Sequence, residues 1–388
     1  MANRRKKTYT ILGKHLHIIC FTVPYPVDYG GVVDLFWKLP FLQKNGIKIH
    51  LHCFDYGRGK QEILHQYCVE VNYYKRSKSF LKLFSSTPFI VVTRKNRLLE
   101  KKLLQDDYPI LCEGIHSTAI LSNEQFNNRK IFVRLHNVEH EYYHHLQKST
   151  TNIFKKVFFY RERILLKKYE NSLSQSQHKL LSVTELDAEK FRTIFNCTTV
   201  QYLPLFLPED WVCNNKIGKG NYCLYNGDLS VVANQKAALW LIKKVIQEMP
   251  NIQFIIAGKN PSAQLSSFQN SISNLKIIAN PNDAIMNELI QDAHIHILPS
   301  NSSSGIKLKL LNALFNGRFC IANNDTISGS GLNELCSIAN TPKEFITAIE
   351  NLVDKNFNTE MIEQRKLALT KKFNNQKNAE LLIDIIFN

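Results

Sequence analysis

A lysine-containing turn in the second half of the chain is the clearest candidate for chemistry. The segment LPSNSSSGIKLKLLNALFNGRF, residues 298–319, has the pattern of a strand end, a turn rich in Ser and Asn, and a helix opened by Gly305. Lys307 and Lys309 then fall in the first helical turn, where the helix dipole disfavours cations unless an anion is present. Together with free backbone N–H groups, they predict a diphosphate cradle. The alternative is a pair of solvated lysines on an ordinary helix.

Two further loops have the composition of anion-binding turns. In TVPYPVDYGGVVDLF, residues 22–36, Gly30 and Gly31 stand at a helix start, where the absence of side chains lets the backbone approach a ligand. In AGKNPS, residues 257–262, Lys259 follows a strand end and is placed to meet a phosphate. A plain tight turn would explain the glycine pair equally well.

A histidine follows one of the expected strands of the first half. In RLHNVEHEYY, residues 134–143, His136 comes where open parallel sheets bind ligands, whereas a helix cap would explain Asn137. The letters HEYYH match the zinc pattern HExxH, with His140 and His144 one helical turn apart. That motif needs a third ligand and an open cleft, so we favour the absence of a metal site.

The elements that must position these residues alternate along the chain. Short apolar runs rich in β-branched residues alternate with helical patterns, which predicts parallel α/β architecture. Strands are expected at 17–23, 47–54, 68–74, 109–114, 130–137, 179–184, 222–229, 252–259, 275–281, 294–300 and 318–324. Helices are expected at 32–43, as one long element near 139–172, and at 306–316.

A proline-rich segment divides the chain. QYLPLFLPEDW, residues 201–211, interrupts the alternation, so we expect one α/β unit in 1–205 and a second in 206–365. The terminal helical stretch is too long to serve the second unit alone. Its end, residues 366–388, should therefore cross back and pack on the first unit.

The net charge of +16 concerns the partners of the protein rather than its fold. Residues 75–102 hold nine Lys or Arg against one acid, and FKKVFFYRERILLKKY, residues 154–169, interleaves basic and aromatic residues. An anionic membrane surface, nucleic acid or phosphorylated substrates would fit such stretches. A solvated basic surface is the alternative.

The cysteines and the apolar runs indicate the compartment. The nine cysteines include no CxxC, and most lie inside apolar runs, which favours a reducing environment. The opening RRKKTYTILGKHLHIICFTV has the basic start of a signal peptide, but Lys14, His15 and His17 break its apolar part. No apolar run approaches the roughly 20 residues that span a bilayer. We expect a cytoplasmic protein, with peripheral contact at the inner face of the membrane as a further expectation.

Taken in order, the GG loop, HN-x-E, AGKNPS and PS…GIKLKLLNAL…G resemble the retaining GT-B glycosyltransferases of the family-four type (glycosyl transferases group 1). The resemblance covers nearly the whole chain, and its C-terminal block is the most specific part. It implies two Rossmann-like domains facing each other across a cleft. The first, 1–205 with the helix 366–388, would bind the acceptor, and the second, 206–365, would bind the nucleotide sugar.

The resemblance also assigns roles to individual residues. His136 would be the catalytic residue, reaching the transferred sugar. The positions implied to bind the donor are Gly30, Gly31, Gly227, Lys259, Gly305, Ile306, Lys307, Lys309 and Asn312, with Asn312 holding the ribose hydroxyls. The family often carries two glutamates seven residues apart, and here Ser304 and Asn312 stand in their places. An amide binds a ribose hydroxyl less strongly than a carboxylate does.

The implied reaction is transfer of a hexose from a GDP- or UDP-linked donor to a hydroxyl of a glycan or lipid-linked glycan. It would proceed with retention, without metal or cofactor, and with no nucleic acid as partner. A nucleotide-sugar epimerase is one alternative, but we find no convincing carboxylate pair for it. A basic nucleic-acid-binding protein is another, and no recognised nucleic-acid module appears.

Overall fold

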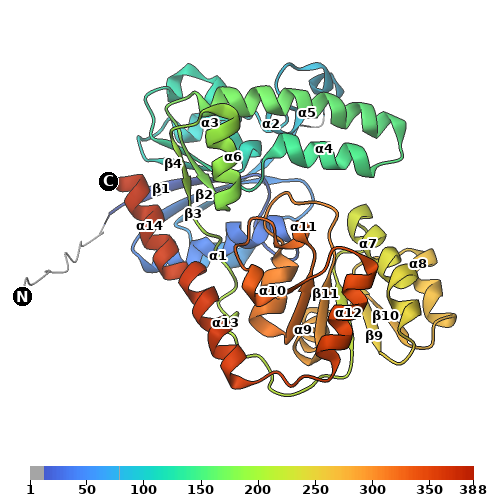
Figure 1. Ribbon diagram of the computed structural model, residues 1–388. Coiled ribbons are helices and arrows are strands. Elements are labelled where there is room, and N and C mark those ends of the chain that lie inside the picture. Colours follow the sequence, from blue (N-terminus) through green and yellow to red (C-terminus); the bar gives the residue numbers. More distant parts are fainter. Residues whose placement is uncertain (1–12, 78) are drawn as a thin grey trace, which may run out of the picture.

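The structure is a computed structural model that describes residues 13–77 and 79–388, so the start of the basic segment weighed as a signal peptide lies outside the described residues. Two parallel β-sheets, each flanked by helices, form two domains (Figure 1). This confirms the α/β fold with two Rossmann-like units.

The first sheet contains seven parallel strands in the order β3-β2-β1-β4-β5-β6-β7. Their bounds are β1 His15–Cys20, β2 Lys48–Asp55, β3 Glu70–Lys75, β4 Ile110–Glu113, β5 Ile131–Leu135, β6 Lys179–Ser182 and β7 Val200–Tyr202. The first six lie on predicted strands. The edge strand β7 was not predicted, because its three residues run directly into the proline-rich segment.

Helices cover both faces of this sheet, which explains why its strands read as continuous apolar runs. The helices of the first domain are α1 Gly30–Lys44, α2 Phe89–Val92, α3 Arg97–Leu103, α4 Glu139–Ser149, α5 Ile153–Ser174 and α6 Glu185–Phe195. One core packs α1 against the sheet, and a second core on the opposite face includes residues of α2, α3, α5 and α6. All five residues of β5 are buried between them.

The single long helix expected near 139–172 is wrong: two helices, α4 and α5, are joined at residues 150–152. The side chain of Asn152 accepts a hydrogen bond from the Lys155 N–H and so caps α5, a signal that the aromatic and charged periodicity of the segment obscured. The two helices pack as a hairpin that extends from one side of the first domain (Figure 1).

The second sheet has six parallel strands in the order β10-β9-β8-β11-β12-β13. Their bounds are β8 Cys223–Asn226, β9 Phe254–Gly258, β10 Leu275–Ala279, β11 Ile295–Leu298, β12 Phe319–Ala322 and β13 Ser337–Ile338. The helices are α7 Val232–Lys244, α8 Ala263–Ser267, α9 Asp283–Asp292, α10 Leu308–Asn316, α11 Asn324–Ile327 and α12 Pro342–Val353. The two-residue strand β13 was not predicted.

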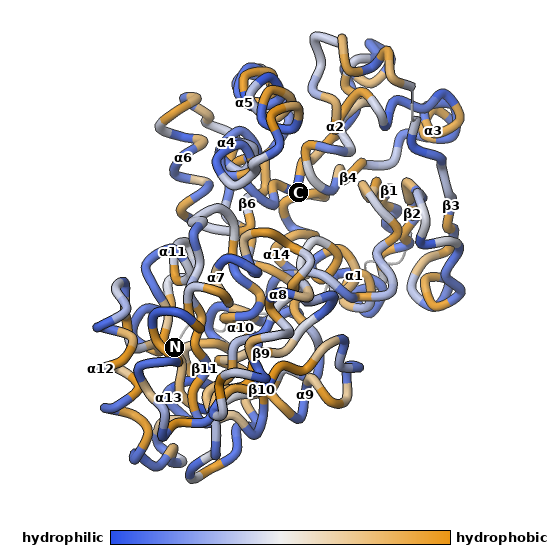
Figure 2. Tube along the Cα trace, turned by 90° about the vertical axis from the view of Figure 1, so that its right-hand side faces the viewer, coloured by the Kyte–Doolittle hydropathy of each residue, from blue (hydrophilic) through white to orange (hydrophobic). Residues whose placement is uncertain are grey.

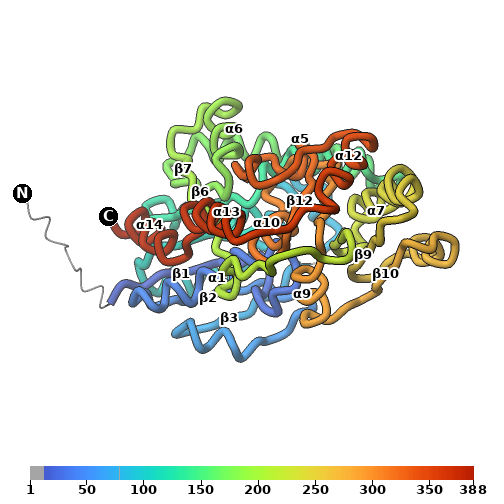
Figure 3. The backbone as a smooth tube through the Cα atoms, turned by 60° about the horizontal axis from the view of Figure 1, so that its bottom comes forward, coloured from blue at the N-terminus to red at the C-terminus, as the bar shows by residue number. Residues whose placement is uncertain are grey.

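The chain ends by returning to the first domain. Helix α13, Thr359–Lys372, leads to α14, Asn375–Phe387, which packs on α1 (Figures 1 and 3). This confirms the predicted crossing. Asn375 exchanges hydrogen bonds of 2.9 and 2.7 Å with the backbone of Leu207, and Asn378 donates to the Leu205 carbonyl at 3.1 Å. The segment between the two sheets is thereby fixed to α14.

Hydropathy follows the layers of the two domains. The outer helices, α5 among them, alternate hydrophilic and hydrophobic stretches along the chain (Figure 2). No helix of the described ranges is long and apolar enough to cross a membrane.

Eight of the nine cysteines are buried and the ninth, Cys336, is half-buried, and all nine are free thiols.

Candidate active site

A cavity of about 550 Å³ lies between the two domains and brings together loops from both sheets. Its lining includes Gly30, Gly31 and His136 from the first domain and Gly227, Ile306, Lys307 and Lys309 from the second. These residues follow the carboxyl ends of their strands or begin the next helix, where parallel sheets bind ligands. The structure thus places seven of the ten residues singled out from the sequence at one cavity.

The glycine pair begins α1 at a point of close approach between the domains. A Cβ atom on Gly30 would lie 3.4 Å from Cδ1 of Leu308, the first residue of α10. A Cβ atom on Gly31 would lie 2.6 Å from the ring of Tyr29, which is too close for a real side chain. The bare backbone at Gly31 therefore avoids a steric clash with Tyr29, whereas a Cβ atom on Gly30 would make only an ordinary contact with Leu308.

Gly305 lies opposite the loop after β5. Its φ of +65° is in the left-handed region, and a Cβ atom there would clash with Oδ1 of Asn137. The Ser/Asn-rich turn of the second domain therefore touches the segment that carries His136. The hydroxyl of Ser304, at the position where the resembled family has a glutamate, is buried and has no hydrogen-bond partner among the described residues.

The two lysines occupy different positions from those predicted. Helix α10 begins at Leu308, so Lys307 is its N-cap residue and only Lys309 lies in the first turn. The Lys307 ammonium turns back to the Ser304 carbonyl and lies 3.3 Å from the Gly305 carbonyl. Lys309 Nζ lies 3.5 Å from the Tyr225 hydroxyl and 4.7 Å from the centre of that ring.

Burial lowers the pKa of each lysine to about 8. For Lys309 the neighbouring charge of Lys307 lowers the pKa further, whereas Asp325 and Asp187 partly oppose the effect of burial on Lys307. Two half-buried ammonium groups beside a helix N-terminus form a positive site whose charges repel each other. An anion bound between them would raise both pKa values toward that of an ordinary lysine.

Three of the ten predicted residues do not line the cavity: Lys259, Gly305 and Asn312. Lys259 is exposed and does not line the cavity. The side chain of Asn312 accepts a hydrogen bond from Asn316 at 2.7 Å and also lies outside the cavity lining. Gly227 does line it, and a Cβ atom there would lie 3.3 Å from the Asn234 amide nitrogen.

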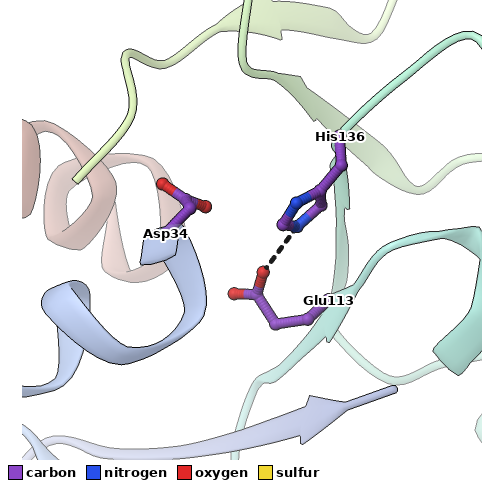
Figure 4. A group of neighbouring side chains, drawn as sticks. All are labelled: Asp34, Glu113 and His136. Atoms are coloured by element: carbon purple, nitrogen blue, oxygen red, sulfur yellow. Dashed lines mark hydrogen bonds and ion pairs between the residues drawn. The ribbon is translucent and has the colours of Figure 1, made fainter. Parts of the chain in front are cut away.

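His136 forms a hydrogen bond with the buried carboxylate of Glu113 (Figure 4). Its Nε2 lies 3.1 Å from Oε2 of Glu113, the last residue of β4, and the other Glu113 oxygen accepts from Lys38 of α1. Burial opposes ionisation of Glu113, but the charge of Lys38 and the His136 hydrogen bond outweigh it and lower the pKa of Glu113. The ionised carboxylate therefore accepts a hydrogen bond from Nε2–H, which leaves Nδ1 as the unprotonated ring nitrogen.

Asp34 of α1 extends this network across the domain. Its carboxylate accepts two hydrogen bonds of 3.0 Å from the fork of Arg134, one of 2.9 Å from Lys38 and one of 2.9 Å from the Phe206 N–H. Arg134 also donates to the carbonyls of Leu203 and Pro204 at 2.6 and 2.9 Å. Burial opposes ionisation, yet the charges of Arg134 and Lys38 hold the pKa of Asp34 well below its ordinary value.

Sequence reasoning missed this network. Asp34 and Lys38 are one helical turn apart on the otherwise apolar segment VVDLFWKLPF, and Glu113 ends an apolar strand. Charged residues at buried positions need partners of opposite charge. Single charged residues within apolar segments were therefore the sequence signal that could have revealed the network. Their partners come from distant strands, which the pattern alone does not pair.

Two groups of side chains have the composition of metal ligands. Asp34, Glu113 and His136 offer ligand atoms within 4.8 Å of one another, but Lys38 already binds both carboxylates and Arg134 binds that of Asp34. In the HEYYH segment, Nδ1 of His140 lies 2.6 Å from Glu170 of α5, which also accepts from the Glu139 N–H. Burial, and then the charge of Glu170, raises the pKa of Glu139 to about 8.

Two parallel-sheet Rossmann-like domains, a cavity between them and a C-terminal helix that crosses back define the GT-B fold. Residues 220–355 match the family model described as Glycosyl transferases group 1. The chain is 26% identical over 353 residues to an uncharacterized 44.6 kDa protein in the cps region of Klebsiella pneumoniae, covering 86% of this chain and 89% of that protein.

Solved structures show the same fold at low identity. TarM of S. aureus aligns over 97% of this chain and 100% of its own, with 11% identity and a TM-score of 0.68. WaaG, a glycosyltransferase involved in lipopolysaccharide biosynthesis, aligns over 96% and 100%, with 10% identity and a TM-score of 0.65. The family match lies within the second domain, and these neighbours share the GT-B fold over nearly the whole chain.

The ion network generates a stability prediction. Asp34→Asn should lower the free energy of unfolding by about 3–5 kcal/mol, because it removes the charge that compensates Arg134 and Lys38 in the interior. Urea denaturation measures the loss. As a control, Lys44→Gln breaks the exposed ion pair with Glu209 and should cost less than about 1 kcal/mol. Equally small losses in the two variants would contradict the account of the network.

Proposed function

We propose that the chain transfers a hexose from a GDP- or UDP-linked donor to a hydroxyl of a glycan or lipid-linked glycan, with retention of anomeric configuration. One observation carries this proposal. Lys307 and Lys309 stand at the N-terminus of α10 on the cavity that also contains His136, and their ammonium groups make hydrogen bonds only to neutral oxygen atoms within the described part of the chain. Unpaired cations of this kind fit the diphosphate of a nucleotide sugar.

The names of the structural neighbours support the same substrate class. TarM of S. aureus was solved with UDP and alpha-GlcNAc-glycerol, and its fold matches this chain over nearly its full length. The Klebsiella relative is described only by its place in a cps region. For this chain, a nucleotide sugar as donor and a glycan as acceptor are therefore proposals that fit the chemistry of the cavity.

In the proposed reaction, the bond between the sugar and the diphosphate breaks as the acceptor oxygen attacks from the same face. The leaving diphosphate gains negative charge, which Lys307, Lys309 and the N–H groups at the start of α10 stabilise. The acceptor hydroxyl gives its proton to the leaving phosphate oxygen, so no protein nucleophile is required. A preorganised set of cations thus replaces the metal ion that other enzymes use to hold a diphosphate.

The proposal assigns no metal to the cavity. In the group formed by Asp34, Glu113 and His136, Lys38 already binds both carboxylates and Arg134 binds that of Asp34, so a divalent cation would have to displace them. His136 then acts through its own ring: Glu113 fixes its orientation, and Nδ1 remains to meet the transferred sugar.

A membrane-facing surface on the first domain fits a lipid-linked acceptor. At the start of α5, the side chains of Ile153, Phe154 and Val157 are exposed, with Phe154 at 83%, and the exposed Lys155 and Lys156 lie between them. The short turn η2, Phe80–Phe84, adjoins this helix, because Arg161 donates to the Ser85 carbonyl. It exposes the side chains of Phe80, Leu81 and Phe84. Apolar tips among lysines are typical of contact with anionic lipid.

Donor binding should depend on pH and not on metal. Because the pKa of Lys309 is about 8, its ammonium is lost as pH rises through that value, and a diphosphate then binds more weakly. The Kd of UDP or GDP, measured calorimetrically in EDTA, should rise above pH 8 by up to about tenfold per pH unit for each of the two lysines, since the pKa of Lys307 is also about 8. Lys309→Arg keeps its charge and should make the profile less steep, leaving the titration of Lys307, whereas Lys309→Gln should abolish tight binding. A Kd that is constant from pH 7 to 9.5 in the wild type would oppose the proposed site.

His136→Ala should lower turnover far more than donor affinity. The histidine acts on the sugar, whereas the diphosphate is held by the opposite domain, so we expect kcat to fall about 100-fold or more with the Kd of the nucleotide nearly unchanged. Steady-state kinetics and nucleotide titration on the same preparation measure both quantities. Unchanged turnover in this variant would remove His136 from the mechanism.

Charge reversal on α5 tests the membrane contact. Lys155, Lys156, Lys167 and Lys168 are exposed, and replacing all four with Glu should abolish co-sedimentation with vesicles containing phosphatidylglycerol. The matched control reverses four exposed lysines of the C-terminal half, Lys343, Lys355, Lys366 and Lys371, and should leave sedimentation intact. Equal sedimentation of both variants would count against a membrane surface on α5.

A further inference from the structure

Five neighbouring strands of the first sheet end at the acceptor side of the cleft, and aromatic or basic residues follow each of them. Phe21 follows β1, Tyr56 follows β2, Arg76 follows β3 and His136 follows β5, while His116 comes three residues after β4. Since all five strands are parallel neighbours, these side chains share one edge of the sheet. The rings of Phe21 and His116 are 5.0 Å apart, and those of Phe21 and His136 are 5.8 Å apart.

Arg94, two residues after α2, reaches the same edge. Its side chain is only 3% exposed, Nε donates to the Phe21 carbonyl at 3.0 Å and Nη1 donates to the Ile90 carbonyl at 2.6 Å. Burial, and then the charge of Arg76, lowers the pKa of Arg94 to about 10. The guanidinium is therefore held in place by backbone oxygens while its charge has no carboxylate to balance it among the described residues.

Arg76 lies beside it and is half-buried. Its Nε donates to Thr93 Oγ1 at 2.9 Å, and its guanidinium carbon lies 5.5 Å from the ring centre of Phe89 and 5.8 Å from that of Tyr56. The Arg94 guanidinium carbon is 5.9 Å from the same Tyr56 ring. Two arginines thus share one exposed aromatic ring at the edge of the sheet.

The carboxylates nearest in the fold are already occupied. The carboxylate of Asp55 accepts hydrogen bonds of 3.0, 3.0 and 3.1 Å from the backbone N–H groups of residues 57, 58 and 59. Glu113 binds Lys38 and His136, and burial raises the pKa of Glu139 to about 8, so that it is mainly protonated at neutral pH. Burial, with the charges of Arg94, His136 and Arg76, lowers the pKa of His116 well below its ordinary value.

We propose that Arg76 and Arg94 bind an oxyanion carried by the acceptor, so that the acceptor is acidic, with a phosphate or a carboxylate close to the hydroxyl that is glycosylated. This inference rests on the proposed function and specifies its acceptor class. Arginine forks bind such groups through paired, charge-assisted hydrogen bonds. Placing a fixed anion there orients the acceptor hydroxyl toward His136 and the donor.

The first experiment titrates the protein with inorganic phosphate and, separately, with glucuronate as a carboxylate probe, at constant ionic strength. The background is Lys309→Gln, which weakens phosphate binding at the donor lysines. The rise of the melting temperature gives the apparent Kd for this background alone, with Arg76→Gln added, and with Lys101→Gln added as a control for loss of one exposed charge in the same domain.

We expect the Arg76→Gln addition to weaken binding of at least one probe about tenfold, and the Lys101→Gln addition to leave it unchanged. A phosphate-selective effect identifies a phosphorylated acceptor, and a glucuronate-selective effect identifies an acidic sugar. Arg94→Lys keeps the charge but loses the fork, so it should weaken the same probe. No stabilisation by either anion, or equal titrations with and without Arg76, would overturn the proposal.

These measurements use no nucleotide and no sugar transfer. Failure of the proposed function would appear as a wild type that binds neither UDP nor GDP, whatever the phosphate titration shows. Failure of the present inference would appear as nucleotide binding that is intact together with anion titrations that do not respond to Arg76 or Arg94.

Discussion

The rest of the structure depends on a buried ion network at the centre of the first domain. Charges removed from water must be compensated inside the protein, and Asp34, Lys38, Glu113 and Arg134 compensate one another almost completely out of contact with solvent. Through them α1, β4, β5 and the segment at residues 203–206 are fixed in one geometry. That geometry places the start of α1, with its glycine pair, opposite His136, and α14 holds the other side of the same segment through Asn375 and Asn378.

Both sides of the cleft carry positively charged side chains, which are lysines on the second domain and arginines on the first. On the second domain, Lys307 and Lys309 are point charges whose lowered pKa values make them sensitive to a bound anion. On the first domain, Arg94 is a rigid fork fixed to backbone carbonyls, with Arg76 beside it. Because the nearby carboxylates are paired or protonated, the cleft favours anionic ligands on both sides. A donor bound to the second domain and an acceptor bound to the first would then face each other at His136.

Much of this could be predicted from the sequence, because local patterns encode it. Apolar runs gave eleven of the strands, the GG pair marked the start of α1, and Gly305 marked the turn before α10. The features that the sequence did not predict depend on helix caps and on contacts between residues far apart in the sequence. Asn152 divides one expected helix into two. The network around Asp34 joins residues up to 172 positions apart, which periodicity cannot show.

The most direct test of the central claim follows the donor by proton NMR, with UDP- and GDP-linked hexoses incubated with the protein in EDTA. The account predicts that one donor is consumed, that the sugar first appears with the anomeric configuration it had in the donor, and that His136→Ala slows this consumption about 100-fold or more. Consumption that stops when EDTA is added, or a sugar that first appears with inverted configuration, would contradict a metal-independent retaining transferase. A wild type that consumes none of the donors, with or without metal, would contradict the proposed activity itself.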